Sequence, residues 1–256
     1  MTAIRPLAVA LFAILSLALA AAAPAQTIYY DDFSGGSATD LGGTAPDIRP
    51  GTETWTANTI LKADGTKSTA AVAPAFLPFT PLPGTVYSLS MDVDVTAATN
   101  TDDWFAIGFS PTNDTTGWHT VNTSVTAWML NRFNDTSPSA FQTFLGPGTA
   151  SAANHDPNPD IVGPLNMKVV LDTQPALWTV EWFVDDVSIR GPVAYAANPA
   201  ISYVGFAGYN STLGSVDNFT LATPVPEPAS AALAAVGAFF LAAAAWRARR
   251  RARSTA

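Results

Sequence analysis

The sequence has no cysteine, and it has few basic residues outside its two ends. The missing cysteine excludes disulfides and every cysteine-based metal or nucleophile site, so the fold must be stabilised by packing. Five of the twelve Lys and Arg residues lie in the last ten positions, and Arg5 lies near the other end. Phosphate binding requires clustered cations, so the composition argues against nucleic acid as a partner. The acidic body favours cations instead.

Catalytic motifs are also scarce. The sequence contains no G-x-S-x-G elbow, no H-E-x-x-H zinc motif and no phosphate-binding G-x-x-x-x-G-K. Its two histidines, His119 and His155, lie in polar segments and are expected to be surface residues. We therefore predict no catalytic residue and a protein that is not an enzyme.

Residues 1–25 have the features of a cleavable signal peptide. A single positive charge at Arg5 precedes an apolar run from Leu7 to Ala22, and Ala23-Pro24-Ala25 matches the small-x-small pattern of signal peptidase sites. Cleavage is expected after Ala25, which predicts export. An uncleaved N-terminal anchor is the alternative.

Residues 229–246 are uncharged and consist mostly of Ala, Leu, Phe and Val. As a helix this segment would be about 27 Å long, close to the hydrocarbon thickness of a bilayer. It is followed by a cluster of arginines: Arg247, Arg249, Arg250, Arg251 and Arg253. Such a cluster stays on the cytoplasmic side, so we predict a transmembrane helix that leaves the body outside. A buried core helix is the alternative.

The tripeptide Pro226-Glu227-Pro228 directly precedes this hydrophobic segment. Two prolines cannot continue a strand ladder, so they present Glu227 on an extended chain. The order of Pro-Glu-Pro, hydrophobic helix and arginine cluster resembles the PEP-CTERM sorting domain of exported proteins in Gram-negative bacteria that make exopolysaccharide. The resemblance implies cleavage near residues 226–228 by exosortase, a membrane-embedded cysteine protease or transpeptidase. The expected partners are then signal peptidase, exosortase and, transiently, the inner membrane.

The body between these ends has the pattern of short β-strands. In Val86 to Val95, alternate residues from Tyr87 to Val95 are apolar and those between them are Ser or Asp. The segments 165–171 and 178–184 alternate similarly around a turn at 172–175, which predicts a hairpin. Further strands are expected near residues 28–33, 105–109, 125–133, 141–145, 201–209 and 216–221. No internal segment shows sustained helical periodicity.

About ten or more short strands separated by turn residues predict an all-β fold, a two-sheet antiparallel sandwich of the jelly-roll type. The expected organisation is a signal peptide at 1–25, a sandwich domain at 26–223 and a sorting tail at 224–256. Two Pro-rich or Asn-rich stretches, Pro74 to Pro83 and Gly146 to Pro164, are expected to be surface loops. The strings at 29–33, 185–187 and 216–221 resemble concanavalin A-like, laminin-G-like jelly rolls. That resemblance implies that the first and last strands pair.

Asp31 and Asp217 are the best candidates for binding a metal. Strand parity places Asp31 with Tyr29 and Phe33, and Asp217 with Phe219, on inward faces. A buried carboxylate needs a partner, and hydrogen bonds from backbone amides are the favoured one. A structural Ca²⁺ is the alternative, because it takes carboxylate and carbonyl oxygens. No other cofactor is expected.

Three tryptophans, Trp104, Trp118 and Trp128, are candidates for a sugar-binding face, because aromatic rings stack on pyranose rings. Core positions are favoured for them, since tryptophans in a sandwich are mostly core. Asp92 and Asp94 share the polar parity of their strand, which favours a solvated face over a pair of catalytic carboxylates.

Together these features predict a cell-surface or extracellular-matrix protein, held first at the inner membrane, whose sandwich binds carbohydrate such as exopolysaccharide or another matrix component. Concanavalin-like folds also include glycoside hydrolases, so a hydrolase or lyase is one alternative. A purely structural coat protein is the other.

Overall fold

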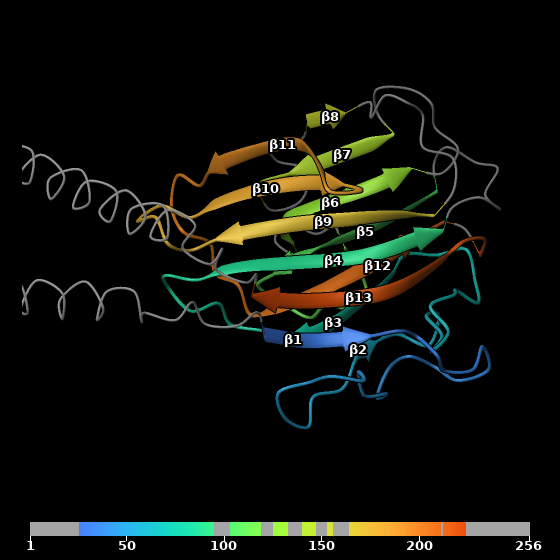
Figure 1. Cartoon of the computed structure of the whole chain (residues 1–256). Coiled ribbons are helices and arrows are strands. Elements are labelled where there is room, and N and C mark those ends of the chain that lie inside the picture. The colour runs from blue at the N-terminus through green and yellow to red at the C-terminus, as the bar shows by residue number, and fades with distance from the viewer. Residues whose placement is uncertain are drawn as a thin grey trace, which may run out of the picture. The chain divides into compact units, whose positions relative to one another are not determined.

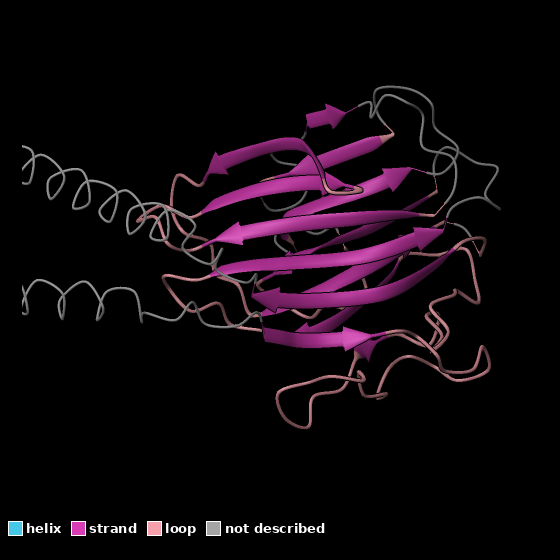
Figure 2. Ribbon diagram, in the orientation of Figure 1, coloured by secondary structure: helices cyan, strands magenta, loops and turns pink. Residues whose placement is uncertain are grey.

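The computed structural model describes residues 26–94, 103–118, 125–132, 140–146, 153–155, 164–210 and 212–223. Residues Thr27–Thr223 form one compact unit. The described residues form thirteen strands in two sheets and contain no helix, and the two sheets stack face to face (Figures 1 and 2). The all-β sandwich is confirmed.

The first sheet has six strands in the order β1-β13-β4-β9-β10-β11. Their bounds are β1 Gln26–Asp31, β13 Ser215–Thr223, β4 Val86–Asp94, β9 Leu165–Asp172, β10 Thr179–Val184 and β11 Val187–Ala194. The first and last strands of the chain are neighbours in it, as the resemblance implied. The pairs β13–β4, β4–β9, β9–β10 and β10–β11 are antiparallel.

The second sheet has seven strands in the order β2-β3-β12-β5-β6-β7-β8. Their bounds are β2 Thr56–Ala57, β3 Ala73–Pro78, β12 Tyr203–Tyr209, β5 Trp104–Ser110, β6 Thr126–Arg132, β7 Phe141–Phe144 and β8 Ala153–His155. The core lies between the two sheets. It includes Leu89 and Met91 from β4, Trp182 from β10, and Ile107 and Phe206 from the second sheet.

The clearest sequence patterns correspond to the strands they predicted. In β4 and β9 buried and half-buried residues alternate over the whole strand, with Leu89, Met91, Met167 and Val169 among the buried ones. The hairpin of β9 and β10 is confirmed, and its two strands pair from Asp172↔Thr179 onward. A period of two is therefore a reliable signal where one strand face meets the core and the other meets water.

The segment Pro74 to Pro83 was predicted to be a surface loop, and that prediction is wrong for its first half. β3 lies between β2 and β12, and its residues from Ala73 to Leu77 are buried. Proline is tolerated in this strand because β2 is only two residues long and pairs only with Ala75 and Phe76. Pro74 and Pro78 therefore lie where one edge of β3 has no ladder to interrupt.

Three further strands lie outside the sequence prediction: the two-residue β2, and β8 and β11. β8 falls within the stretch Gly146 to Pro164, which was expected to be a loop, and pairs with β7. β11 extends the predicted hairpin by a third strand at the edge of the six-stranded sheet. Its residues are mostly exposed, so it lacks the alternation from which a strand is predicted.

The central strands of the seven-stranded sheet, β3, β12, β5 and β6, are buried on both faces over most of their length. The inner face of the sheet belongs to the core between the sheets, and its outer face forms a second apolar layer. This layer consists of Phe76, Trp104, Ala106, Trp118, Val125, Trp128, Leu130, Phe144 and Ala207. Strand β5 is consequently buried along its whole length, with no alternation.

Candidate functional site

The sorting segment predicted from the sequence lies outside the described residues. This applies to Pro226, Glu227 and Pro228, to the hydrophobic segment 229–246 and to the arginines from 247 to 253. The signal peptide at 1–25 also lies outside them, as does His119. Within the part of the chain that the structure describes, no helix is long and apolar enough to cross a membrane.

The three candidate tryptophans are brought together in the second apolar layer. Trp104 begins β5, Trp128 lies on β6, and Trp118 comes from the connection between those strands. Trp118 stacks on Phe76 at a centroid distance of 5.7 Å and meets Trp128 edge to face at 6.2 Å. All three side chains are at most 3 % exposed. In this conformation their ring faces pack on the protein itself, which is the arrangement expected of core tryptophans.

Asp31 lies where its parity predicted, buried at the end of β1 beside Tyr29. One carboxylate oxygen accepts a hydrogen bond from Trp55 Nε1 at 2.6 Å, and the other accepts one from the Phe33 amide at 2.8 Å. Burial raises the pKa of Asp31 above its ordinary value, while these two hydrogen bonds act in the opposite direction. The protein therefore supplies a donor to each oxygen.

The parity prediction for Asp217 is wrong. Val216 is buried and Asp217 is exposed, although Phe219 and Leu221 point inward as expected. The reason is a β-bulge: the pairing of β13 with β4 shifts between Asp217 and Thr220, and Asn218 has a φ of +50°. One extra residue reverses the alternation before the bulge relative to that after it.

Asp31 is instead grouped with Asp32 and Asp47. One carboxylate oxygen of each lies within 4.8 Å of the others, with Asp31 buried and the other two exposed. Asp47 Oδ2 accepts a hydrogen bond from the Asp32 amide at 3.1 Å. Hydrogen bonds from Ser34 lower the pKa of Asp32. This is the set of carboxylates that could hold a cation, and the sequence prediction included one of its three members.

The outer face of the six-stranded sheet is polar and carries a hydrogen-bonded row across four strands. Tyr30 Oη donates to Asn218 Oδ1 at 2.9 Å, and Asn218 Nδ2 donates to Asp92 Oδ2 at 2.9 Å. Asp92 Oδ1 accepts from Asn166 Nδ2 at 2.7 Å. Both oxygens of Asp92 are thus occupied by neutral amides. This favours the solvated-face interpretation of Asp92 over a catalytic role.

His155 is not the plain surface residue that the sequence predicted. It is half-buried on β8, and its Nε2 lies 2.8 Å from Thr143 Oγ1. Burial and then the charge of Arg190 lower the pKa of His155 below its ordinary value. It therefore fastens the short edge strand β8 to β7.

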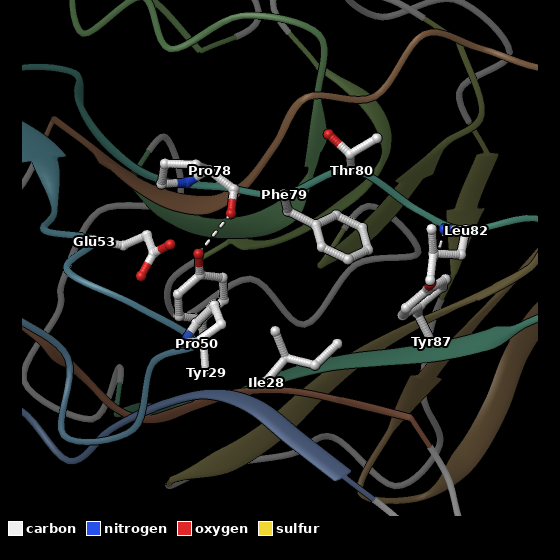
Figure 3. Close-up of a pocket in the computed structure, with 9 residues that line it drawn as sticks. All are labelled: Ile28, Tyr29, Pro50, Glu53, Pro78, Phe79, Thr80, Leu82 and Tyr87. Atoms are coloured by element: carbon white, nitrogen blue, oxygen red, sulfur yellow. Dashed lines mark hydrogen bonds between the residues drawn. The ribbon is translucent and has the colours of Figure 1, made fainter.

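A pocket of about 320 Å³ lies between the start of β1 and the connection from β3 to β4 (Figure 3). Its lining residues are Ile28, Tyr29, Pro50, Glu53, Pro78, Phe79, Thr80, Leu82 and Tyr87. Two tyrosine hydroxyls are fixed by the backbone: Tyr29 Oη donates to Pro78 O at 2.6 Å, and Tyr87 Oη accepts from the Leu82 amide at 2.8 Å. Phe79 and Tyr87 meet edge to face at 4.9 Å.

Glu53 supplies the one carboxylate of this pocket. Its Oε2 accepts a hydrogen bond from the Gly51 amide at 2.7 Å, which fixes the loop that carries it. Burial, and then the charge of Glu53, raise the pKa of Tyr29 to about 12, so the Tyr29 hydroxyl stays protonated at neutral pH. Sequence reasoning missed this site because its residues come from four separate segments, one of which was predicted to be a plain surface loop.

Comparison with known proteins adds two findings. Residues 224–251 match the family model of the PEP-CTERM protein-sorting motif. No curated protein matches the sequence.

Solved structures are similar to the chain in fold, at low sequence identity. A protein of unknown function with a galectin-like fold from Bacillus subtilis is 12% identical, with 79% of this chain and 99% of that chain covered and a TM-score of 0.50. An endo-1,3-beta-glucanase from Streptomyces sioyaensis is 10% identical over 80% of this chain and 98% of its own, with a TM-score of 0.47. The carbohydrate recognition domain of Emp47p is 12% identical over 79% and 98%, with a TM-score of 0.46.

The sorting tail and the jelly roll predicted from the sequence are thereby confirmed: the chain carries a PEP-CTERM protein-sorting motif at residues 224–251, and the unit Thr27–Thr223 has a galectin-like, concanavalin-like fold.

Proposed function

We propose that this protein is a substrate of exosortase that is exported, held in the inner membrane by residues 229–246, cleaved near Pro226-Glu227-Pro228 and released to the cell surface or extracellular matrix. The observation that carries this proposal is the match of residues 224–251 to the PEP-CTERM sorting motif. The order of tripeptide, apolar segment and arginine cluster within that match supports it, because it combines a cleavable site with a stop-transfer signal.

The sandwich of the released protein is proposed to bind carbohydrate without catalysis. The pocket between β1 and the β3–β4 connection supports this function, because it combines apolar and aromatic walls with a single carboxylate. Ligand pockets usually have this composition and a volume of about 300–1,000 Å³. The C–H face of a sugar ring suits the walls formed by Ile28, Tyr29 and Phe79, and a sugar hydroxyl can donate to Glu53. The three buried tryptophans remain candidates only if their layer opens.

The proposed binding is tested by a glycan array probed with protein released from its native host, followed by calorimetry on any glycan retained. Glu53→Gln should weaken binding about tenfold, since a hydrogen bond to a charged group contributes about 1.5 kcal/mol. Gln can still accept the hydrogen bond from Gly51, so the loop should keep its conformation. Glu181→Gln is the matched control, because Glu181 lies on the outer face of β10 and accepts a hydrogen bond from Ser188.

Three outcomes separate the candidate functions. Saturable binding that Glu53→Gln weakens and Glu181→Gln leaves unchanged supports a lectin-like module. Turnover of a bound glycan would contradict the non-catalytic proposal and favour a hydrolase or lyase. No binding to any glycan on the array would favour a structural coat protein with no specific glycan ligand.

A further inference from the structure

One end of the sandwich carries three connections without any charged residue. They are residues 79–85 between β3 and β4, residues 173–178 between β9 and β10, and residues 195–202 between β11 and β12. None contains Asp, Glu, Lys or Arg. In an acidic protein of net charge −8, three neighbouring connections without a charged residue form a distinct part of the surface. We call these three connections the uncharged platform.

Strand register places the three connections together. Val86, at the start of β4, pairs with Asp172 at the end of β9, and Thr179 pairs with Ala194 at the end of β11. Figure 1 shows the starts of β4 and β10 and the ends of β9 and β11 at the same end of the sheet. The opposite end has a different character, since its β10–β11 turn is Asp185-Asp186.

Hydrogen bonds join the three connections into one surface. The Gly84 amide donates to Thr173 O at 3.0 Å, and Thr173 Oγ1 donates to Leu82 O at 2.7 Å. The Trp178 amide donates to Asn198 Oδ1 at 2.8 Å, and Asn198 Nδ2 donates to Ala176 O at 3.0 Å. Because the backbone of the platform is fixed in this way, its side chains are presented in a defined arrangement.

The platform exposes apolar side chains that the fold itself does not use. Leu82 is 66% exposed and Leu177 is 47% exposed, while Trp178 is half-buried against the core. Leucines that project beside a tryptophan suit the boundary between lipid headgroups and acyl chains, where the amphipathic indole ring is favoured. Asp172 adjoins one of the three connections in sequence, and the β5–β6 connection, which starts at this end beside Tyr203, carries Asp114.

The chain leaves the sandwich at this same end. Thr223 is the last residue of β13, and Ala222 pairs with Ser88 close to the start of β4. Only residues 224–228 separate Thr223 from the apolar segment 229–246, and five extended residues span about 17 Å. The headgroup layer takes up roughly 5–8 Å of that reach. An anchored precursor therefore holds this end of the sandwich close to the bilayer.

We propose that the uncharged platform rests on the outer surface of the inner membrane while the precursor is anchored, with Leu82 and Leu177 inserted among the headgroups. This inference depends on the proposed anchor at residues 229–246. Charge favours the same orientation, because anionic lipids repel carboxylates and the three connections of the platform contain none. Leu82 also lines the pocket, so docking and glycan binding share a residue.

The absence of cysteine gives a direct experiment. Single substitutions Leu82→Cys and Leu177→Cys are labelled with an environment-sensitive fluorophore in the full chain, reconstituted in phosphatidylethanolamine–phosphatidylglycerol liposomes that contain brominated lipid. The matched controls are Val187→Cys and Leu213→Cys, which are 66% and 43% exposed and lie at the opposite end. Quenching at positions 82 and 177 should be at least twofold greater than at the controls.

Hydrogen exchange provides a measurement without a label. Amides of residues 79–85 and 173–178 should exchange more slowly in the anchored protein than in protein whose tail has been removed, while residues 185–190 should not change. Equal quenching at both ends and unchanged exchange, in protein that floats with the liposomes, would overturn the docking proposal alone. Protein that fails to float would overturn the anchor and the docking together. Protection that appears only when exosortase is added would assign the platform to a protein partner and contradict the lipid proposal.

Discussion

Lys67 places an ammonium group inside the sandwich. Its side chain is 5% exposed and packs against Gly208, where an added Cβ would lie 2.6 Å from Lys67 Cδ. Its Nζ has no hydrogen-bond partner among the described residues. Burial lowers the pKa of Lys67 to about 8, and the charge of Asp103 opposes that shift. A buried cation with no hydrogen bond is a cost that the rest of the fold has to offset.

This cost predicts a stability that rises with pH. Between about pH 8 and pH 10.5 the unfolded chain still binds the proton that folded Lys67 has lost, so the free energy of unfolding should increase by about 3 kcal/mol. From about pH 10 the raised pKa values of Tyr29 and Tyr195 lower the free energy of unfolding as pH rises, because the unfolded tyrosines ionise before the folded ones. Urea unfolding at a series of pH values measures the slope.

The variant Lys67→Met separates this residue from other titrating groups. It should raise the free energy of unfolding at pH 7 by about 1–3 kcal/mol and flatten the slope between pH 8 and 10, since it keeps an apolar chain and removes the charge. A variant that is less stable at pH 7, or that keeps the slope, would show that Lys67 is compensated in the folded protein.

Asp31 allows a test of hydrogen bonding against metal binding. Both oxygens accept from N–H donors, and an asparagine can accept only one of these bonds. Asp31→Asn should therefore lower the free energy of unfolding by about 1–3 kcal/mol. The loss should be the same in calcium and in chelator. If calcium raises the melting temperature of the native chain and Asp31→Asn abolishes that increase, Asp31 and its neighbours Asp32 and Asp47 hold a cation instead.

The two metal candidates show how far parity can be trusted at single residues. Asp31 was placed correctly because β1 is regular up to its last residue. Asp217 was misplaced because a bulge begins there, and the sequence marks that bulge only by Asn218, a residue that tolerates positive φ. Alternation can be read from the chain, whereas the point at which a bulge reverses it depends on the pairing with β4.

At the scale of elements, the second apolar layer includes one strand that escaped prediction, β3. β3 is buried from Ala73 to Leu77 and was obscured by its prolines, whereas β5, buried along its whole length, was predicted near residues 105–109. A strand covered on both sides has no polar alternate positions, so its sequence resembles any other apolar run. For the strands with one solvated face, β4, β9 and β10, the sequence correctly predicted both the position of the strand and which side chains point into the core.

The layer also predicts the behaviour of Trp118. The ring is fully buried and stacks on Phe76, but its Nε1 has no hydrogen-bond partner among the described residues. Trp118→Ala should lower the free energy of unfolding by about 3–5 kcal/mol through loss of packing. Trp118→Phe should cost much less, because it keeps a ring against Phe76 and removes the unpaired N–H.

Thermal unfolding of both variants measures this difference, and glycan binding of Trp118→Phe gives the functional control. Binding unchanged in Trp118→Phe agrees with a structural role for the layer. If Trp118→Phe is as stable as the native chain and yet loses glycan binding, the tryptophan layer contacts the ligand, and the pocket beside Glu53 is not the site.

The molecule as a whole combines a tail that directs its export with a sandwich that has two distinct ends. The tail could be recognised from sequence because sorting depends on the order of local features, a short motif followed by an apolar segment and a cluster of arginines. The pocket and the uncharged platform could not be recognised in this way. The platform is assembled from connections that the register of β4, β9 and β11 brings together, and the pocket is assembled from four segments that are separate in the sequence.

The most direct test of the central claim is the mass of the protein recovered from its native host. Intact-mass and C-terminal peptide analysis of the surface or secreted fraction should give a chain that begins at Gln26 and ends near residue 228. The same chain should be retained in the membrane fraction, with its arginine cluster, when exosortase is deleted. A secreted form that still contains residues 229–253 would contradict the account, because the tail would then be neither a substrate of exosortase nor a temporary anchor.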